Sequence, residues 1–125
     1  MKIATIIVRI LMGLMFLFAS ISYFFKLFPV PEMKGAEKIF NDGVAASIYL
    51  MPLIKVIELL CGLLFVVGRY VALATVVIFP IVVNIFCYHA FVGPEGLPVA
   101  VPLLLCNLFL AYAYRKNYTG LFAAK

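Results

Sequence analysis

Six polar side chains lie inside long apolar stretches and are the candidates for chemistry: Arg9, Lys55, Glu58, Asn84, His89 and Asn107. A charged side chain at the centre of a bilayer costs about 2.5–3.5 kcal/mol on insertion scales, so each charge needs a partner, a water-filled cavity or a route to the interface. Intramembrane ionisable residues are for that reason a default hypothesis for a functional site. We interpret the six as a ligand-binding set or an intramembrane polar cluster, and we assign no catalytic residue.

Depth along the helices indicates which of these groups could meet. At a rise of about 1.5 Å per residue, Arg9 and Glu58 reach similar depths from one membrane face, so an Arg9–Glu58 ion pair is one expectation. Lys55 lies three residues from Glu58 on the same helix face and is the competing partner. Glu58, Asn84 and Asn107 would form one hydrogen-bonded layer if all three face inward. Helix-to-helix contact is the commoner role of such asparagines, whereas for Arg9 and Glu58 structural and functional roles remain equally open.

Histidine and cysteine give little support for a metal or a resident cofactor. His89 is the only histidine, so neither bis-histidine haem ligation nor a two-histidine metal site is available. The three cysteines, Cys61, Cys87 and Cys106, fall on separate stretches without C-x-x-C spacing, which favours a role as small apolar residues. His89 is expected to be an interfacial polar residue, with hydrogen bonding to a quinone as the alternative. No metal site and no cofactor are predicted, and quinone is the one cofactor whose binding is left open.

Composition identifies the environment in which these residues must be positioned. The chain has 125 residues, of which 67% are apolar and 12% charged. Soluble domains are about 45–50% apolar and about 25% charged, and disordered chains are less apolar still, so both classes are excluded. Four apolar stretches, at about residues 3–28, 49–67, 71–91 and 97–114, have the length that a helix needs to cross a bilayer. They lack the alternation of barrel strands, which predicts helices.

The connections between the stretches predict how the helices are arranged. Short turns at residues 68–70 and 92–96 contain glycine and imply antiparallel neighbours. The one long connection, residues 29–48, has apolar residues at helical spacing: Met33, Ala36, Ile39 and Phe40. We predict a short amphipathic interfacial helix there, ending at Asn41-Asp42-Gly43. The predicted fold is a single domain, residues 1–125: an all-α, membrane-spanning, antiparallel four-helix bundle with a short interfacial helix between spans one and two.

Charge placement predicts orientation. The end of the bundle with both termini would hold six basic residues and no acidic side chain: Lys2, Arg9, Arg69, Arg115, Lys116 and Lys125. The positive-inside rule then places both termini in the cytoplasm. The net charge of +5 is therefore a topology signal, and the partner it implies is the lipid bilayer and not a nucleic acid.

The motifs resemble those of the DoxX-like family of small membrane proteins. Residues 8–13 resemble its R-x-x-x-G opening, and residues 52–62 resemble its second-helix signature with E-x-x-x-G at the centre. Residues 68–70 resemble the short basic turn that follows, and residues 80–86, followed by His89, resemble the third-helix pattern of one bacterial branch. The resemblance covers nearly the whole chain. It implies a four-helix bundle in the bacterial inner membrane, with relatives linked to quinone reduction, thiosulfate oxidation, oxidant defence or the assembly of other membrane proteins; most members have no assigned activity.

Two functional hypotheses follow. The leading one is a non-catalytic accessory or scaffold subunit of a membrane complex, with a membrane protein or an oxidoreductase as its partner and no enzymatic activity of its own. The alternative is a quinone-interacting redox component of the bacterial inner membrane that uses Arg9, Glu58, Asn84 and His89 as polar contacts. A transporter or oligomeric pore is disfavoured because the four spans show no internal repeat.

Overall fold

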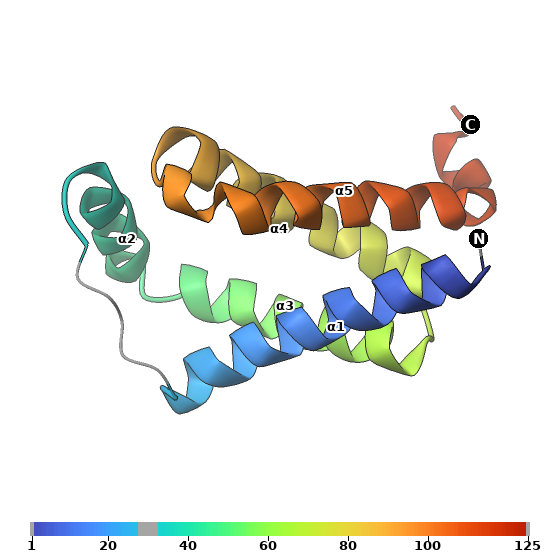
Figure 1. The fold of residues 1–125 in the computed structure, drawn as a ribbon, viewed down its shortest axis with the longest axis horizontal. Helices are drawn as coiled ribbons and strands as arrows, with labels where there is room; N and C mark the ends of the chain where they lie inside the picture. Colours follow the sequence, from blue (N-terminus) through green and yellow to red (C-terminus); the bar gives the residue numbers. More distant parts are fainter. Residues whose placement is uncertain (1, 28–32, 125) are drawn as a thin grey trace.

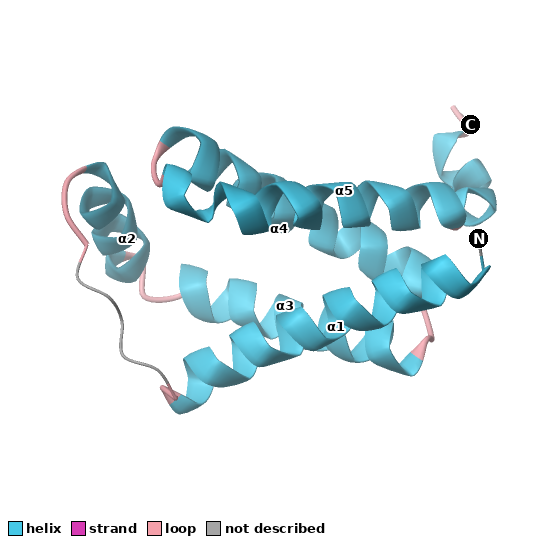
Figure 2. Cartoon of the chain, in the orientation of Figure 1, coloured by secondary structure: helices cyan, strands magenta, loops and turns pink. Residues whose placement is uncertain are grey.

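The computed structural model describes residues 2–27 and 33–124, and in this part of the chain every regular element is helical (Figure 1, Figure 2). Among the described residues, four helical segments are long and apolar enough to cross a membrane. They are α1 (Lys2–Phe25), α3 (Leu50–Val67), α4 (Val71–Phe91), and α5 (Leu97–Ala113) taken together with the 3-10 turn η1 (Pro94–Gly96) that precedes it. The all-α bundle is therefore confirmed, and the chain is a multi-pass membrane protein.

Span boundaries agree closely with the prediction except at the end of the first span. Helix α1 ends at Phe25, short of the predicted residue 28, which itself lies outside the described residues. Lys26 adopts a left-handed φ of 52°, and the Leu27 amide donates to the Ser22 carbonyl at 3.1 Å. This backbone geometry closes the last turn of α1 before the apolar run is finished.

Helix α1 packs most extensively on α3, and two glycines permit the close approach (Figure 1). A Cβ atom added to Gly13 would lie 2.9 Å from the Gly62 carbonyl oxygen, and one added to Gly62 would lie 3.0 Å from the Gly13 carbonyl oxygen. The two backbones are thus in direct contact, as in other membrane helix pairs built on small residues.

Helices α4 and α5 form the second closely packed antiparallel pair, and the core lies where the two pairs meet. Its fully buried side chains include Phe16 of α1, Phe65 of α3, Ile78 and Val82 of α4, and Leu110 of α5. Two hydroxyl groups in this region bond within their own helices: Ser20 donates to the Phe16 carbonyl at 2.7 Å, and Thr75 donates to the Val71 carbonyl at 2.7 Å.

The predicted helix between spans one and two is present as α2 (Ala36–Ala46), but its predicted end is wrong. The helix continues through Asn41, Asp42 and Gly43, since the Asn41 side chain donates to the Glu37 carbonyl at 2.8 Å within the helix and does not cap its end. The helix ends at Ala46, just before Ile48 adopts a left-handed φ of 72°. The expected apolar face is also only partly used, since Ile39 is 75% exposed. A row at helical spacing, Glu37, Asn41 and Val44, is half-buried instead.

A second 3-10 segment, η2 (Arg115–Phe122), follows α5 and was not predicted. Its Tyr118 is buried, and the hydroxyl donates to the Ala72 carbonyl near the start of α4 at 2.8 Å. Burial raises the pKa of Tyr118, which keeps the hydroxyl protonated as a donor. This contact holds the C-terminal segment at the end of the bundle where α1 begins (Figure 1).

Candidate functional site

A cavity of about 200 Å³ opens between α2, α3 and α4 and is the candidate site. It is lined by Phe40, Asn41, Met51, Ile54, Lys55, Glu58, Ile81, Asn84, Ile85, Tyr88 and His89. Four of the six predicted polar residues, Lys55, Glu58, Asn84 and His89, therefore share one cavity, whereas Arg9 and Asn107 lie elsewhere. We refer to it as the Glu58 cavity.

The charged centre of the Glu58 cavity is an ion pair within α3. The Lys55 ammonium lies 3.1 Å from Glu58 Oε2, and the two side chains are 19% and 4% exposed. The expectation of an Arg9–Glu58 pair is therefore wrong, and the competing partner, Lys55, is the one that pairs. Lys55 Nζ also lies 5.9 Å from the centre of the Tyr23 ring on α1, which adds a cation–π contact.

Glu58 keeps unused capacity to accept hydrogen bonds. Although Lys55 is close, Oε2 is buried without a partner in hydrogen-bond geometry anywhere in the described chain. A buried acceptor without a donor is unfavourable, and a donor on a molecule inside the cavity would satisfy it.

His89 is held at the outer end of the cavity by the turn that follows α4. Its Nδ1 lies 2.9 Å from the Gly93 carbonyl oxygen, and its ring occupies the space where a side chain at Gly96 would lie. A carbonyl only accepts, so Nδ1 carries the proton in this bond, and in the neutral ring Nε2 is then an acceptor. The turn thereby sets both the position of the imidazole ring and the tautomer that faces the cavity.

Asn84 lies on the open side of the cavity. It is exposed although it occupies the middle part of a membrane-spanning helix, and it also lines an adjoining, mostly apolar cavity of about 390 Å³. Lipid tails offer no hydrogen-bond partners to an amide. The amide is therefore available to a molecule that enters from the bilayer.

Helix α2 covers the Glu58 cavity through contacts with Tyr88. The Asn41 amide donates to the Tyr88 hydroxyl at 2.9 Å, and the Phe40 and Tyr88 rings lie 4.9 Å apart between centres. Neither Asn41 nor Tyr88 belonged to the predicted set. The spacing of Glu37, Asn41 and Val44 on one face was the signal for the first, and the position of Tyr88 directly before His89 was the signal for the second.

Removing the Tyr88 hydroxyl should loosen α2. A neutral hydrogen bond contributes about 1 kcal/mol, so Tyr88→Phe should raise the exchange rate of the α2 amide hydrogens about fivefold. Hydrogen exchange measured by mass spectrometry on peptides from Ala36–Ala46 would detect this. Tyr112→Phe, an exposed tyrosine on α5, is the matched control and should leave α2 exchange unchanged. Equal exchange in Tyr88→Phe and the parent protein would contradict the assigned contact.

Asn107 does not join Glu58 and Asn84, so the predicted three-residue layer is wrong. Its side-chain nitrogen donates to the Thr75 carbonyl at 3.4 Å, and its Oδ1 is buried with no partner in the described chain. Measured from the end with the termini, at 1.5 Å per residue, Asn107 lies about 9 Å deep, Glu58 about 14 Å and Asn84 about 20 Å. The three groups are therefore at different levels, and Asn107 joins α5 to α4 instead.

Arg9 lies at the opposite end of the bundle from His89. Its guanidinium packs on Gly68, the residue that ends α3, and occupies the space where a side chain at Gly68 would lie. Gly68 has a left-handed φ of 82°, which favours glycine for a second reason. The long Arg9 side chain thus reaches toward the membrane interface and away from Glu58.

The cysteines are free and lie on α3, α4 and α5. In residues 2–27 and 33–124, no group of three or more histidine, cysteine or acidic side chains is placed to hold a metal ion. No family model, curated protein or solved structure matches this chain. The Glu58 cavity is therefore the feature of the molecule that points to a function.

Proposed function

We propose that the protein is a DoxX-like membrane protein that binds a quinone-class ring in the Glu58 cavity. The observation that supports the proposal is the gathering of Lys55, Glu58, Asn84 and His89 around one cavity at membrane depth. Three of these four residues are the polar contacts expected for a quinone; the fourth expected contact, Arg9, is too distant to take part. Quinone binding is therefore better supported than a purely structural role for these residues.

The lining suits a flat ring with two oxygen atoms. Ile54, Ile81 and Ile85 provide apolar walls, while the Lys55 ammonium and the Asn84 amide are donors for carbonyl oxygens. A volume of about 200 Å³ is below the range of about 300–1,000 Å³ for drug-sized ligands, so it suits a headgroup whose tail remains in the bilayer. A quinone supplies the electron transfer when bound; Glu58 and His89 are the groups that could exchange its protons.

Lipid extraction of the purified protein tests this proposal. Protein isolated in mild detergent should contain quinone, identified by chromatography and mass spectrometry of the extract. Glu58→Gln and His89→Ala should each lower the bound amount of the reduced ring, the quinol, about tenfold, because Glu58 and His89 Nε2 are the acceptors for its hydroxyl groups and each such hydrogen bond is worth about 1.5 kcal/mol. The matched control is Glu95→Gln, the same chemical change at an exposed site in η1.

The Glu95→Gln control distinguishes loss of quinone from the Glu58 cavity from an effect of removing any carboxylate. Equal loss of quinone from Glu95→Gln and Glu58→Gln would contradict binding in the Glu58 cavity, as would an extract of the parent protein with no quinone. Helical content by circular dichroism should be the same in all variants, so that loss of ligand is not loss of fold.

A second proposal retains the non-catalytic accessory or scaffold subunit. It is favoured by the direct backbone contact between α1 and α3 at Gly13 and Gly62 and by the exposed apolar side chains that this closely packed pair carries. Its partner would be another membrane protein or an oxidoreductase. Gentle purification should recover that partner in fixed stoichiometry; recovery of the chain alone, with bound quinone, would favour the first proposal.

Location and orientation form part of the same proposal. The described end with the termini carries Lys2, Arg9, Arg69, Arg115 and Lys116, while the four described acidic residues lie in α2, in η1 and at the middle of α3. By the positive-inside rule this arrangement favours both termini in the cytoplasm of a bacterial inner membrane.

A further inference from the structure

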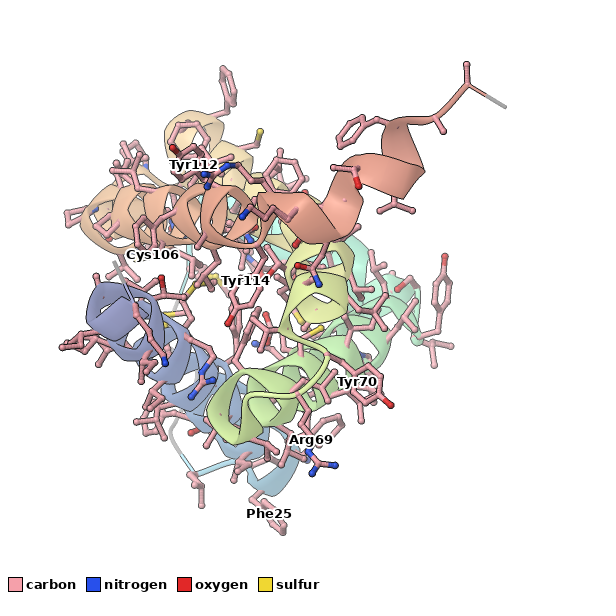
Figure 3. The ribbon with its side chains drawn as sticks, turned by 90° about the vertical axis from the view of Figure 1, so that its right-hand side faces the viewer. Phe25, Arg69, Tyr70, Cys106, Tyr112 and Tyr114 are labelled. Carbon is pink, nitrogen blue, oxygen red and sulfur yellow. The ribbon has the colours of Figure 1, made fainter. Side chains whose placement is uncertain are left out.

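A second cavity, of about 430 Å³, lies between the start of α1 and the end of α5, at the end of the bundle away from His89. It is lined by Lys2, Thr5, Ile6 and Arg9 from α1 and by Ala113 and Tyr114 at the end of α5. Figure 3 looks onto this end, with Tyr114 directed inward between α1 and α5. We refer to it as the Arg9 cavity.

The Arg9 cavity presents positive charge without a counter-charge from the residues that the structure describes. Arg9 Nε is buried, and no group in residues 2–27 or 33–124 accepts a hydrogen bond from it. The four described acidic residues, Glu37, Asp42, Glu58 and Glu95, all lie in other parts of the fold. An unpaired buried donor on a charged group is costly, so an anion in the cavity would stabilise this end of the bundle.

The side chains fit one class of anion. A guanidinium binds phosphate oxygens with paired, charge-assisted hydrogen bonds, and a lysine ammonium adds a second positive charge. Lys2 is exposed at the mouth and Arg9 is half-buried deeper in, so the two charges are at different depths in one cavity. Tyr114 brings a hydroxyl group to the same cavity.

The surroundings of the cavity indicate where such a phosphate comes from. The neighbouring side chains Ile3 and Tyr112 are 74% and 57% exposed, and both belong to helices that contact lipid. Basic pockets between membrane helices at the interface are sites for anionic lipid headgroups. A free phosphate ion would make no contact with these exposed side chains, whereas a lipid would cover them with its acyl chains.

We propose that the Arg9 cavity binds the phosphate of an anionic phospholipid, with Arg9 and Lys2 as the charged contacts. This site is separate from the Glu58 cavity and does not depend on the proposed quinone binding. Zwitterionic lipids carry the same phosphate together with an ammonium group, which the two cations disfavour. The site therefore selects lipids by net charge.

Native mass spectrometry of the full chain in detergent, titrated with phosphatidylglycerol or phosphatidylcholine of equal acyl length, tests the proposal. We expect phosphatidylglycerol to bind about tenfold more tightly. Arg9→Gln and Lys2→Gln should each lower its affinity about fivefold or more. Lys116→Gln removes one charge at the same end but outside the cavity, and should change the affinity less than about twofold.

Three results would overturn the proposal. Equal binding of the two lipids would remove the selectivity, and an equal loss in Lys116→Gln would indicate diffuse attraction to the charged end. Displacement of bound phosphatidylglycerol by millimolar inorganic phosphate would identify a free-anion site instead. Lys2→Gln alters an exposed residue at the start of α1, so it carries the test even if Arg9→Gln does not fold.

Discussion

Lys55→Met is expected to lower the free energy of unfolding by about 3 kcal/mol, because it leaves the Glu58 carboxylate buried without its counter-charge. Glu58 is 3% exposed and lies in the middle of α3, so its short side chain cannot extend to the membrane interface. Glu58→Gln should cost less, since Lys55 is partly exposed, lies one turn nearer the interface and can extend toward it. Unfolding in mixed micelles, followed by circular dichroism as dodecyl sulfate is added, would measure both changes.

The double variant provides the decisive comparison. Lys55→Met combined with Glu58→Gln should recover most of the stability lost in Lys55→Met alone, because no uncompensated charge remains. Lys38→Met, at an exposed lysine of α2, is the matched control and should have little effect. If Lys55→Met were as stable as the parent, or the double variant no more stable than the single one, Lys55 would not be the partner that stabilises Glu58.

Gly13→Ala should destabilise the bundle by about 1–3 kcal/mol, even though alanine favours helices more than glycine does. The added methyl carbon would lie 2.7 Å from Val66 Cγ2 and 2.9 Å from the Gly62 carbonyl oxygen. A backbone oxygen cannot move aside alone, so α1 and α3 must separate along their whole contact. The same micelle unfolding measurement would report the change.

Gly43→Ala is the matched control for this prediction. Gly43 lies within α2 and has no atom within 4 Å of an added Cβ, so the substitution should be neutral or stabilise by up to about 1 kcal/mol. The two glycine-to-alanine changes are thus expected to have opposite signs. A neutral Gly13→Ala would show that α1 and α3 tolerate a wider spacing.

The spans and the site could be predicted to different degrees from the sequence. Lengths of the apolar stretches located α3, α4 and α5 to within a residue, because hydropathy reports directly on bilayer crossing. Hydropathy also identified four polar residues inside the spans as candidate site residues, since polar side chains are rare at that depth: Lys55, Glu58, Asn84 and His89.

The pairing of Arg9 could not be predicted in the same way. Sequence position gives depth but not the rotation of a helix about its axis, and in a membrane both the core and the lipid face are apolar. Arg9 and Glu58 have compatible depths, yet Arg9 extends to Gly68 and Glu58 meets Lys55. The contact of Asn41 with Tyr88 was missed because it depends on how α2 docks, which no local pattern records.

The contact between α1 and α3 also has a consequence for biosynthesis. Its two glycines, Gly13 and Gly62, both belong to the first 67 residues, so this pair can associate as soon as α3 has left the ribosome. At about 5–20 residues per second, α1 waits only seconds in the bilayer for its main neighbour. Helices α4 and α5 then follow as a second hairpin joined by a short turn. Chain growth and helix association thus proceed in the same order, and no early helix depends on the last one for its closest contact.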